Sequence, residues 1–373
     1  MQKNYTSLGL MSGTSGDGVD ASIISSNGID QFEVIKDKYY EYDSNIYKSF
    51  HSLKEKILNV KNLEEFSKEI LNLERKITMF HSKIIREIEF KDRINLVGFH
   101  GQTIYHNSNE KISKQLGNGK LLNQLTKKKI IYNFRKNDIL NGGEGAPLTP
   151  IFHQIIATQK KIMLPICFLN IGGISNITVI KKKDRSLELF SKDLGPGNCL
   201  IDSWIRKNSN KKFDLDGKFA SIGKKNDIIL EQAQELYANR INKKKLSYDT
   251  SDFDVSFARG LSLEDGAATL TDFTASIIAE ELISSFLKFD TEIREILICG
   301  GGRKNTYLLK KIKKNLSSNL NLKLVDDYEV NGDFIESQAF AFLAIRSMLK
   351  LPISFPNTTG CVKPCTGGEL IEN

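Results

Sequence analysis

The stretch from Ser12 to Asp20 gathers three hydroxyl groups, three glycines and two carboxylates near the start of the chain. Apolar runs flank it (Tyr5–Met11 and Val19–Ile24), so the pattern predicts a strand, a tight turn and a second strand. Small residues let a phosphate group approach the backbone closely, and N–H and hydroxyl groups can hold its oxygens. Asp17 and Asp20 could orient a metal ion or a water molecule. An ordinary glycine-rich hairpin explains this stretch equally well when it is taken alone.

Asp193 is a candidate general base. It lies at the predicted end of a strand, before the sharp turn Gly195-Pro196-Gly197-Asn198 and an apolar helix that begins near Leu200. A carboxylate beside such a loop can take a proton from a substrate or a water molecule. The neighbouring helix N-terminus can hold phosphate oxygens. A structural role in the turn is an equal alternative for Asp193.

Two further loops carry polar side chains that could face a ligand. The predicted strand Ile94–Phe99 ends in His100-Gly101-Gln102-Thr103, and loops at strand ends commonly face the ligand in an α/β sheet. His100 could be a ligand-binding residue or a base, although a hydrogen-bonded loop histidine is the more common case. Arg135 and Asp138 flank the glycine-rich loop 141–150, where they could bind a polar small molecule or form a surface ion pair.

A third glycine turn, Gly300–Gly302, separates the predicted buried strand Glu295–Cys299 from a helix predicted to start at Tyr307. Strand, glycine turn and helix in this order indicate a nucleotide contact, because glycine lets a base or ribose lie flat on the backbone. Glu336 lies in the first turn of the predicted helix Gly332–Met348. The helix dipole alone would favour a carboxylate there.

Length and composition restrict the class of protein. A chain of 373 residues is longer than one typical core, so two domains are expected. The hydrophobic content of 40% and the charged content of 26% are typical of a soluble globular protein. The net charge of +8 comes mainly from short lysine runs that have no interleaved aromatic residues. Such runs are usually solvated surface, so no nucleic-acid partner is expected.

The cysteines and the apolar pattern indicate a cytoplasmic location. Five cysteines at irregular spacing argue against a disulfide framework. Cys361 and Cys365 lie four positions apart with no second ligand pair near them in the sequence, which argues against a zinc site. No signal pattern and no long apolar span is present, so a membrane protein is not expected.

The elements that must position these residues repeat once along the chain. After the opening hairpin come a predicted strand (Phe32–Tyr40) and helices with apolar residues at three- and four-residue steps (Ser44–Val60 and Leu63–Ile88). A second strand, glycine turn and returning strand follow over 164–180, with Gly172–Asn176 as the turn. This recurrence predicts two halves of related topology.

Taken together, these stretches resemble a known family. The turns at Gly13–Asp20, Asp193–Asn198 and Gly300–Gly302 occur in the order typical of the actin-like, sugar-kinase ATPase fold. More narrowly, the chain resembles the 1,6-anhydro-N-acetylmuramic acid kinase family, through motifs that span residues 9 to about 344 and so nearly the whole chain. The matching motifs are Gly-Leu-Met-Ser-Gly-Thr-Ser-Gly-Asp-Gly-Val-Asp, Phe-His-Gly-Gln-Thr, Gly-Gly-Glu-Gly-Ala-Pro-Leu, Asn-Ile-Gly-Gly-Ile-Ser-Asn, Asp-Leu-Gly-Pro-Gly-Asn, Asp-Leu-Asp-Gly, Cys-Gly-Gly-Gly and Glu-Ser-Gln-Ala-Phe-Ala-Phe-Leu-Ala.

The resemblance implies an α/β fold of two actin-like (ribonuclease H-like) ATPase domains, each with a mixed central sheet, and a cleft between them. Residues 1–160 would form the N-terminal domain with the first phosphate loop and part of the sugar site. Residues 161–373 would form the C-terminal domain with the catalytic aspartate and the adenosine loop. The family also suggests a homodimer.

The implied reaction belongs to the recycling of cell-wall peptidoglycan. ATP, water and 1,6-anhydro-N-acetylmuramic acid give N-acetylmuramic acid 6-phosphate and ADP. Asp193 matches the family's general base, which deprotonates the water that attacks the anomeric carbon. Mg²⁺ and the loop N–H groups would carry the phosphoryl charge. Two alternatives are an actin-like kinase of another amino sugar, in which Asp193 deprotonates a sugar hydroxyl, and a non-catalytic ATP-dependent sugar sensor.

The resemblance assigns further residues to ATP, sugar and metal. The residues expected at ATP are Gly13, Thr14, Ser15, Gly16, Asp17, Gly18, Val19, Asp20, Gly172, Gly195, Gly300, Gly301, Gly302 and Asn305. Those expected at the sugar are His100, Gln102, Arg135, Asp138, Glu144, Asn176 and Glu336. Asp17 and Asp20 are the candidates for holding Mg²⁺ through water.

The sequence departs from the family pattern at four places. Gly16 replaces a larger apolar residue and should loosen the first turn. Leu194 replaces a common threonine, which removes one hydroxyl contact, and Glu144 replaces a glutamine, which adds a charge near the sugar. The segment 247–260 keeps only Arg259-Gly260 of an expected Pro-Pro-Lys-Ser-Thr-Gly-Arg-Glu run, so a sugar-contacting or domain-closing loop is expected to differ.

Overall fold

The computed structural model describes residues 3–88, 94–184, 186–240 and 246–372. The chain divides into two compact units, Met1–Ile162 with Asp333–Asn373, and Met163–Gly332. No helix in the described ranges is long and apolar enough to cross a membrane. Each unit contains one sheet of mixed parallel and antiparallel strands together with helices, as the family resemblance implied.

The sheet of the first unit has the strand order β12-β6-β4-β1-β2-β3, with β5 paired to β4. The strands β1, β2 and β3 form an antiparallel meander, and β4 lies parallel to both β1 and β6. The predicted opening hairpin is confirmed, since Met11 pairs with Asp20 at its closed end. The strand bounds are β1 Tyr5–Ser12, β2 Gly18–Ser26, β3 Phe32–Glu41, β4 Leu96–Asn107, β5 Ile112–Leu116, β6 Lys129–Tyr132 and β12 Glu369–Ile371.

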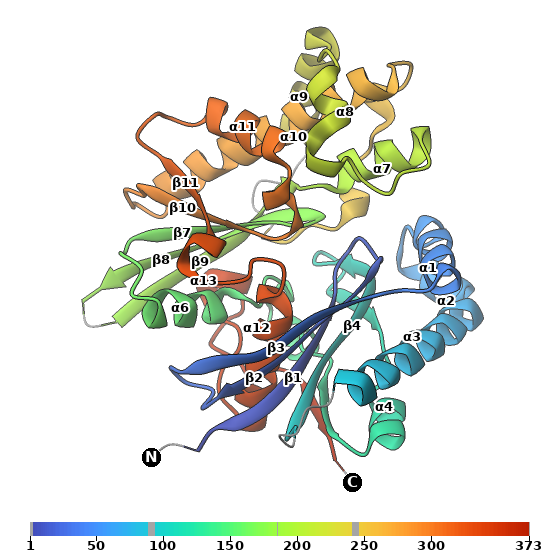
Figure 1. Ribbon diagram of the computed structural model, residues 1–373, viewed down its shortest axis with the longest axis vertical. Coiled ribbons are helices and arrows are strands. Elements are labelled where there is room, and N and C mark those ends of the chain that lie inside the picture. The colour runs from blue at the N-terminus through green and yellow to red at the C-terminus, as the bar shows by residue number, and fades with distance from the viewer. Residues whose placement is uncertain (1–2, 89–93, 185, 241–245, 373) are drawn as a thin grey trace. The chain divides into compact units, whose positions relative to one another are not determined.

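Helices α1, α3 and α4 lie beside this sheet (Figure 1). They contribute buried apolar residues, such as Phe50, Ile77 and Leu122, to its core. The predicted helix Ser44–Val60 is shorter than expected, because Asn59 accepts a hydrogen bond from Lys61 N–H and caps a separate helix. The helix bounds are α1 Ser44–Lys56, α2 Val60–Glu65, α3 Ser67–Ile88, α4 Gly119–Thr126, α5 Lys136–Leu140, α6 Pro150–Gln159, α12 Ile335–Met348 and α13 Pro356–Thr359.

The sheet of the second unit has the order β11-β10-β7-β8-β9. An antiparallel meander of three strands beside parallel strands repeats the arrangement β6-β4-β1-β2-β3 of the first unit. This repetition confirms the prediction of two halves of related topology. Helices α10 and α11 pack on the sheet, while α7, α8 and α9 pack against α10. The bounds are β7 Ile166–Ile171, β8 Ile174–Lys183, β9 Ser186–Pro196, β10 Glu295–Cys299, β11 Asn321–Leu324, α7 Cys199–Asn208, α8 Lys218–Ile222, α9 Asp227–Arg240, α10 Leu263–Lys288 and α11 Thr306–Asn315.

The two units differ from the predicted domains in the position of the C-terminal segment. The sequence predicts that residues 333–373 belong to the C-terminal domain, whereas in the structure Asp333–Asn373 belongs to the first unit. Helix α12 of this segment packs on β1, β2 and β4. Its last strand, β12, pairs with β6 and so joins the first sheet.

Two strands continue beyond the points where the sequence predicted that they end. Strand β4 runs through His100, because Leu10 pairs with Phe99 and Met11 with Gly101, which leaves His100 as the extra residue of a β-bulge. Strand β9 runs through Asp193 in the same way. There Asn176 pairs with Asp193 and Ser175 with Gly195, and the bulge falls at Leu194.

Candidate active site

The turn between β1 and β2 is tight and is fixed by three hydrogen bonds. Gly16 N–H donates to the Gly13 carbonyl at 3.2 Å, Ser15 Oγ donates to Asp17 Oδ1 at 2.6 Å, and Gln102 Nε2 donates to the Gly13 carbonyl at 2.8 Å. Gly16 has φ +64°, and a Cβ there would lie 2.2 Å from the Phe50 ring. The Phe50 ring therefore occupies the space that a larger residue at position 16 would need, and the looser turn stays a prediction.

Asp17 and Asp20, the two carboxylates of the turn, both act electrostatically on the hydroxyl group of Tyr39. The pKa of the Tyr39 hydroxyl is raised by burial and then by the charges of Asp17, Glu41 and Asp20. Asp20 sits on β2 directly opposite Tyr39 on β3. A concentration of negative charge at the end of a glycine turn suits a hydrated divalent cation.

His100 and Arg135 are brought together in the first unit. His100 Nδ1 lies 2.7 Å from the Gly101 carbonyl, and His100 Nε2 lies 3.0 Å from Arg135 Nη2. Burial and the Arg135 charge hold the pKa of His100 well below its ordinary value. The neutral imidazole thus donates from Nδ1 and accepts from the guanidinium, which suits a positioning residue better than a base.

Arg135 also connects this pair to the glycine-rich loop and to α12. Its Nη1 donates to the Gly145 carbonyl at 2.7 Å. Around Glu336, on the first turn of α12, burial raises the carboxyl pKa while the Arg135 charge opposes the rise. The Arg135 guanidinium therefore bonds to His100 and to the glycine-rich loop, and its charge also acts on Glu336 of α12.

Asp138 holds the glycine-rich loop. Its Oδ2 accepts from Gly145 N–H at 2.7 Å, and its Oδ1 accepts from Thr359 Oγ at 2.6 Å. Glu144 N–H donates to the Thr359 carbonyl at 2.8 Å. Both oxygens of Asp138 thus bind protein groups. The sequence did not identify Thr359, because it lies far along the chain in an unremarkable threonine pair.

Asp193 is buried on β9 in the second unit, with 6% of its surface exposed. Its Oδ2 accepts from Tyr248 N–H at 2.8 Å, and its own N–H donates to the Leu246 carbonyl at 2.8 Å. The irregular segment 247–260, which departs from the family pattern, therefore begins by fixing this carboxylate. Sequence reasoning did not assign Tyr248 a role, since a main-chain donor leaves no mark in the side-chain pattern.

Asn176 lies beside Asp193 on the adjacent strand β8. Its Oδ1 is buried and has no hydrogen-bond partner among the described residues, and the same holds for Gln102 Oε1 in the first unit. A buried amide oxygen without a partner is costly. Each is an acceptor suited to a ligand hydroxyl or amide.

The glycines of the second unit allow close backbone contacts. Gly197 N–H donates to the Gly173 carbonyl at 2.9 Å, and a Cβ on Gly197 would lie 2.3 Å from the Gly172 oxygen. Gly195 has φ +147°, and a Cβ there would meet the Tyr237 hydroxyl at 2.6 Å. The turn between β7 and β8 and the turn before α7 are therefore held together by main-chain contacts.

The glycine triplet lies where β10 ends beside β7. Gly300 has φ +77°, and a Cβ there would be 2.3 Å from Asn170 Oδ1. A Cβ on Gly301 would meet nothing within 4 Å, so the backbone is open at that point. Asn305 caps α11 by accepting from Leu308 N–H at 2.9 Å. The open glycine next to a helix N-terminus is the feature of this loop that suits a nucleotide.

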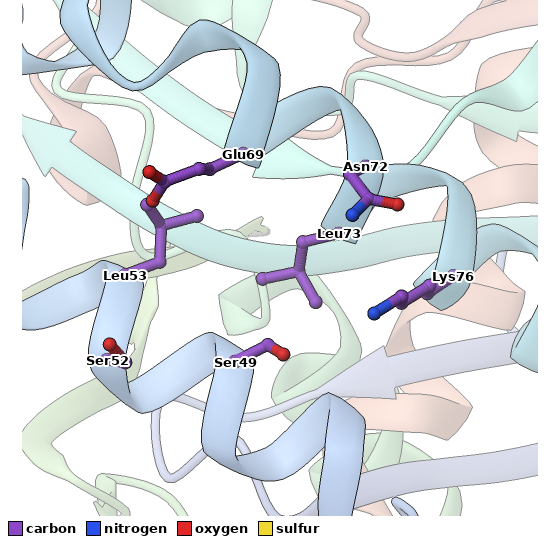
Figure 2. Close-up of a pocket in the computed structure, with 7 residues that line it drawn as sticks. All are labelled: Ser49, Ser52, Leu53, Glu69, Asn72, Leu73 and Lys76. Carbon is purple, nitrogen blue, oxygen red and sulfur yellow. The ribbon is translucent and has the colours of Figure 1, made fainter.

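A pocket of about 220 Å³ lies apart from these residues, between α1 and α3 (Figure 2). Ser49 and Leu53 from α1 face Leu73 and Lys76 from α3 across it. None of the site residues predicted from the sequence lines this pocket.

Comparison with known proteins matches residues 5–373 to the family model described as anhydro-N-acetylmuramic acid kinase. A protein of that name from Pelagibacter ubique is 55% identical, with 100% of each chain covered. Others so named are 35% identical in Zymomonas mobilis (97% of this chain, 98% of the relative) and 33% identical in Agrobacterium fabrum (98% of each). One solved structure, the activator of 2-hydroxyisocaproyl-CoA dehydratase from Clostridium difficile with bound ADPNP, has a TM-score of 0.38 and 13% identity over 92% of this chain and 97% of its own.

Proposed function

The chain belongs to the anhydro-N-acetylmuramic acid kinase family, and we propose from this that it opens 1,6-anhydro-N-acetylmuramic acid with water and phosphorylates O6 at the expense of ATP. The products are N-acetylmuramic acid 6-phosphate and ADP, in the recycling of peptidoglycan. The observation that carries the proposal is the family match over residues 5–373, since motifs for each predicted role lie within it. A cytoplasmic location and a homodimer stay predictions.

Asp193 is the proposed general base. Tyr248 N–H donates to its carboxylate, and the Leu246 carbonyl accepts from its main-chain N–H, so both the side chain and the backbone are held, as a base needs. It takes a proton from the water that attacks the anomeric carbon. The bond from that carbon to O6 then breaks, O6 keeps the electron pair and attacks the γ-phosphorus, and ADP leaves.

The turn Gly13–Asp20 is the proposed phosphate loop. Gly13, Thr14, Ser15, Gly16, Gly18 and Val19 offer small side chains and main-chain groups at the phosphates. Asp17 and Asp20 are the residues that would hold Mg²⁺ through water, which fits the negative charge gathered around Tyr39. The ion would neutralise charge on the phosphates during transfer. Gly172, Gly195 and the triplet at Gly301 are proposed to face the rest of the nucleotide, and Asn305 to cap the helix behind it.

The sugar is proposed to bind Gln102, Arg135, Glu144, Asn176 and Glu336. The buried oxygens of Gln102 and Asn176 support this, because a sugar hydroxyl or an acetamido N–H would satisfy them. His100 acts through Arg135, whose guanidinium it fixes. Asp138 acts through Gly145, whose N–H it holds.

The test is a turnover assay with purified protein, Mg·ATP and 1,6-anhydro-N-acetylmuramic acid, following ADP and the sugar product together. We expect one N-acetylmuramic acid 6-phosphate for each ADP. Open N-acetylmuramic acid serves as the matched control and should give little turnover. Equal turnover with the open sugar would favour an ordinary amino-sugar kinase, and binding without turnover would favour a sensor.

A further inference from the structure

Asp138, Cys361 and Cys365 form a buried cluster in the first unit. One side-chain oxygen or sulfur of each residue lies within 4.8 Å of the others, and Cys365 Sγ is 3.8 Å from Asp138 Oδ1. The exposed fractions are 1% for Asp138, 1% for Cys361 and 6% for Cys365. The two cysteines looked isolated in the sequence because Asp138 precedes Cys365 by 227 residues.

The spacing of these atoms matches a thiophilic metal. Zinc binds sulfur at about 2.3 Å and carboxylate oxygen at about 2.0–2.2 Å, so neighbouring ligand atoms of a tetrahedral site lie about 3.5–3.8 Å apart. The Cys365 thiol donates a hydrogen bond to Asp138 Oδ1 at 3.8 Å, so these two atoms already lie about as far apart as two zinc ligands. Ser354 Oγ and Cys365 Sγ share a second hydrogen bond, of 3.1 Å.

The carboxylate is already oriented by outer partners. Gly145 N–H holds Asp138 Oδ2 and Thr359 Oγ holds Oδ1. Metal-binding carboxylates are commonly supported in this way, and the support adds to metal affinity. Between the cysteines, Val362, Lys363 and Pro364 are exposed.

Metal-bound thiols lose their protons, so a divalent ion would bind the sulfurs of Cys361 and Cys365 as thiolates.

We propose that Asp138, Cys361 and Cys365 form a binding site for a thiophilic divalent cation such as Zn²⁺. Binding releases two thiol protons to solvent and gives one carboxylate–metal and two sulfur–metal bonds. Since Asp138 also holds Gly145, the ion joins the C-terminal segment to the glycine-rich loop. The contacts that support this site are separate from those that support the kinase activity, although Asp138 also holds the glycine-rich loop of the proposed sugar site.

Cobalt titration of the full, reduced chain without a polyhistidine tag tests the site. Co²⁺ bound by two thiolates gives a sulfur-to-metal charge-transfer band, which Zn²⁺ should remove by competition. We expect the band to saturate at one Co²⁺ per chain. Cys361→Ser and Cys365→Ser should each weaken or remove the band. Each should also reduce the affinity for Co²⁺ by about 100-fold or more, which exceeds the effect of losing a residue that only supports a metal ligand. Cys199→Ser, a thiol in the second unit, is the matched control and should bind like the wild type.

A milder variant separates metal binding from folding. Thr359→Val keeps both thiols and the carboxylate but removes the hydroxyl that orients Asp138 Oδ1. We expect about 10-fold weaker Co²⁺ binding with the charge-transfer band retained, and an unchanged far-ultraviolet circular dichroism spectrum. Absence of the band in the wild type, or its full retention in a Cys361→Ser/Cys365→Ser double variant, overturns the proposal. Neither result depends on turnover of sugar or ATP.

Discussion

Replacing Asp193 by Asn tests the assignment of the base with little disturbance of the fold. An asparagine side-chain oxygen can accept the 2.8 Å hydrogen bond from Tyr248 N–H in place of Asp193 Oδ2. The main-chain bond from residue 193 to the Leu246 carbonyl involves no side chain and is kept. The variant therefore loses the proton acceptor and retains the contacts that position it.

The expected cost follows from the role. Positioned acid–base groups contribute about 10²- to 10⁴-fold to a rate, and each factor of ten corresponds to about 1.36 kcal/mol in the barrier. Asp193→Asn should thus lower kcat by 10²- to 10⁴-fold, or about 3–5 kcal/mol. The dissociation constant of ATP should change by less than threefold, because no nucleotide contact is assigned to this side chain.

The assay measures steady-state release of ADP and N-acetylmuramic acid 6-phosphate at saturating substrates, with ATP binding measured separately. Asp265→Asn is the matched control. It removes a carboxylate of the same unit that also accepts a main-chain hydrogen bond, from Lys224 N–H at 2.7 Å. We expect the control to keep wild-type kcat. A kcat for Asp193→Asn within tenfold of the wild type would refute the assignment.

Two further predictions concern stability. Burial lowers the pKa of His81 to about 4 and that of His153 to about 3. The unfolded chain takes up protons on both as the pH falls below about 6.5 while the native protein does not, so the free energy of unfolding should fall by about 2 kcal/mol per histidine from pH 7 to pH 5. Buried His100, whose pKa is also held well below its ordinary value, adds to this loss. Urea unfolding at both pH values should show the loss reduced by about 2 kcal/mol in His153→Asn, and an unchanged loss would contradict the shifted pKa. Gly9→Ala should destabilise by about 3 kcal/mol or more, because its Cβ would lie 1.9 Å from the Ser337 carbonyl oxygen. Gly301→Ala, with open space at its Cβ, should stay within about 0.5 kcal/mol of the wild type by urea unfolding, and equal losses in the two variants would sink the packing argument.

The local pattern predicted which elements exist, but it could not predict where strands continue. Apolar alternation and glycine turns located both hairpins and the strand before Gly300. The same glycine signal made His100 and Asp193 look like residues at strand ends. In the structure both lie at β-bulges inside longer strands. A bulge depends on pairing with a strand that is distant in the sequence, so neither the local propensity nor the periodicity contains it.

The motifs of the sequence predicted which residues belong to the candidate site. They did not predict which of these residues form hydrogen bonds with one another. The sequence named Arg135 and Asp138 together as a possible ion pair. In the structure Arg135 instead forms hydrogen bonds with His100 and with the Gly145 carbonyl. Asp138 accepts hydrogen bonds from Thr359 and from the Gly145 N–H. Two of these pairings involve the main chain of Gly145, and main-chain groups are the same at every residue. The other two join side chains that lie 35 and 221 positions apart in the sequence. A pattern of side-chain types cannot distinguish them.

Glycines inside strands of the first unit indicate that another segment packs closely on its sheet. That segment is Asp333–Asn373, which belongs to the first unit. Gly9 in β1 and Gly98 in β4 have no turn to explain them. A Cβ on Gly98 would lie 2.3 Å from the Phe340 carbonyl oxygen, and one on Gly9 would collide with the backbone of α12. A glycine inside a strand commonly marks the close approach of another backbone. Paired glycines on adjacent strands therefore predict that a helix crosses the sheet there, and the small residues of α12, Ser337 and Ala341, identify it as the helix that fits.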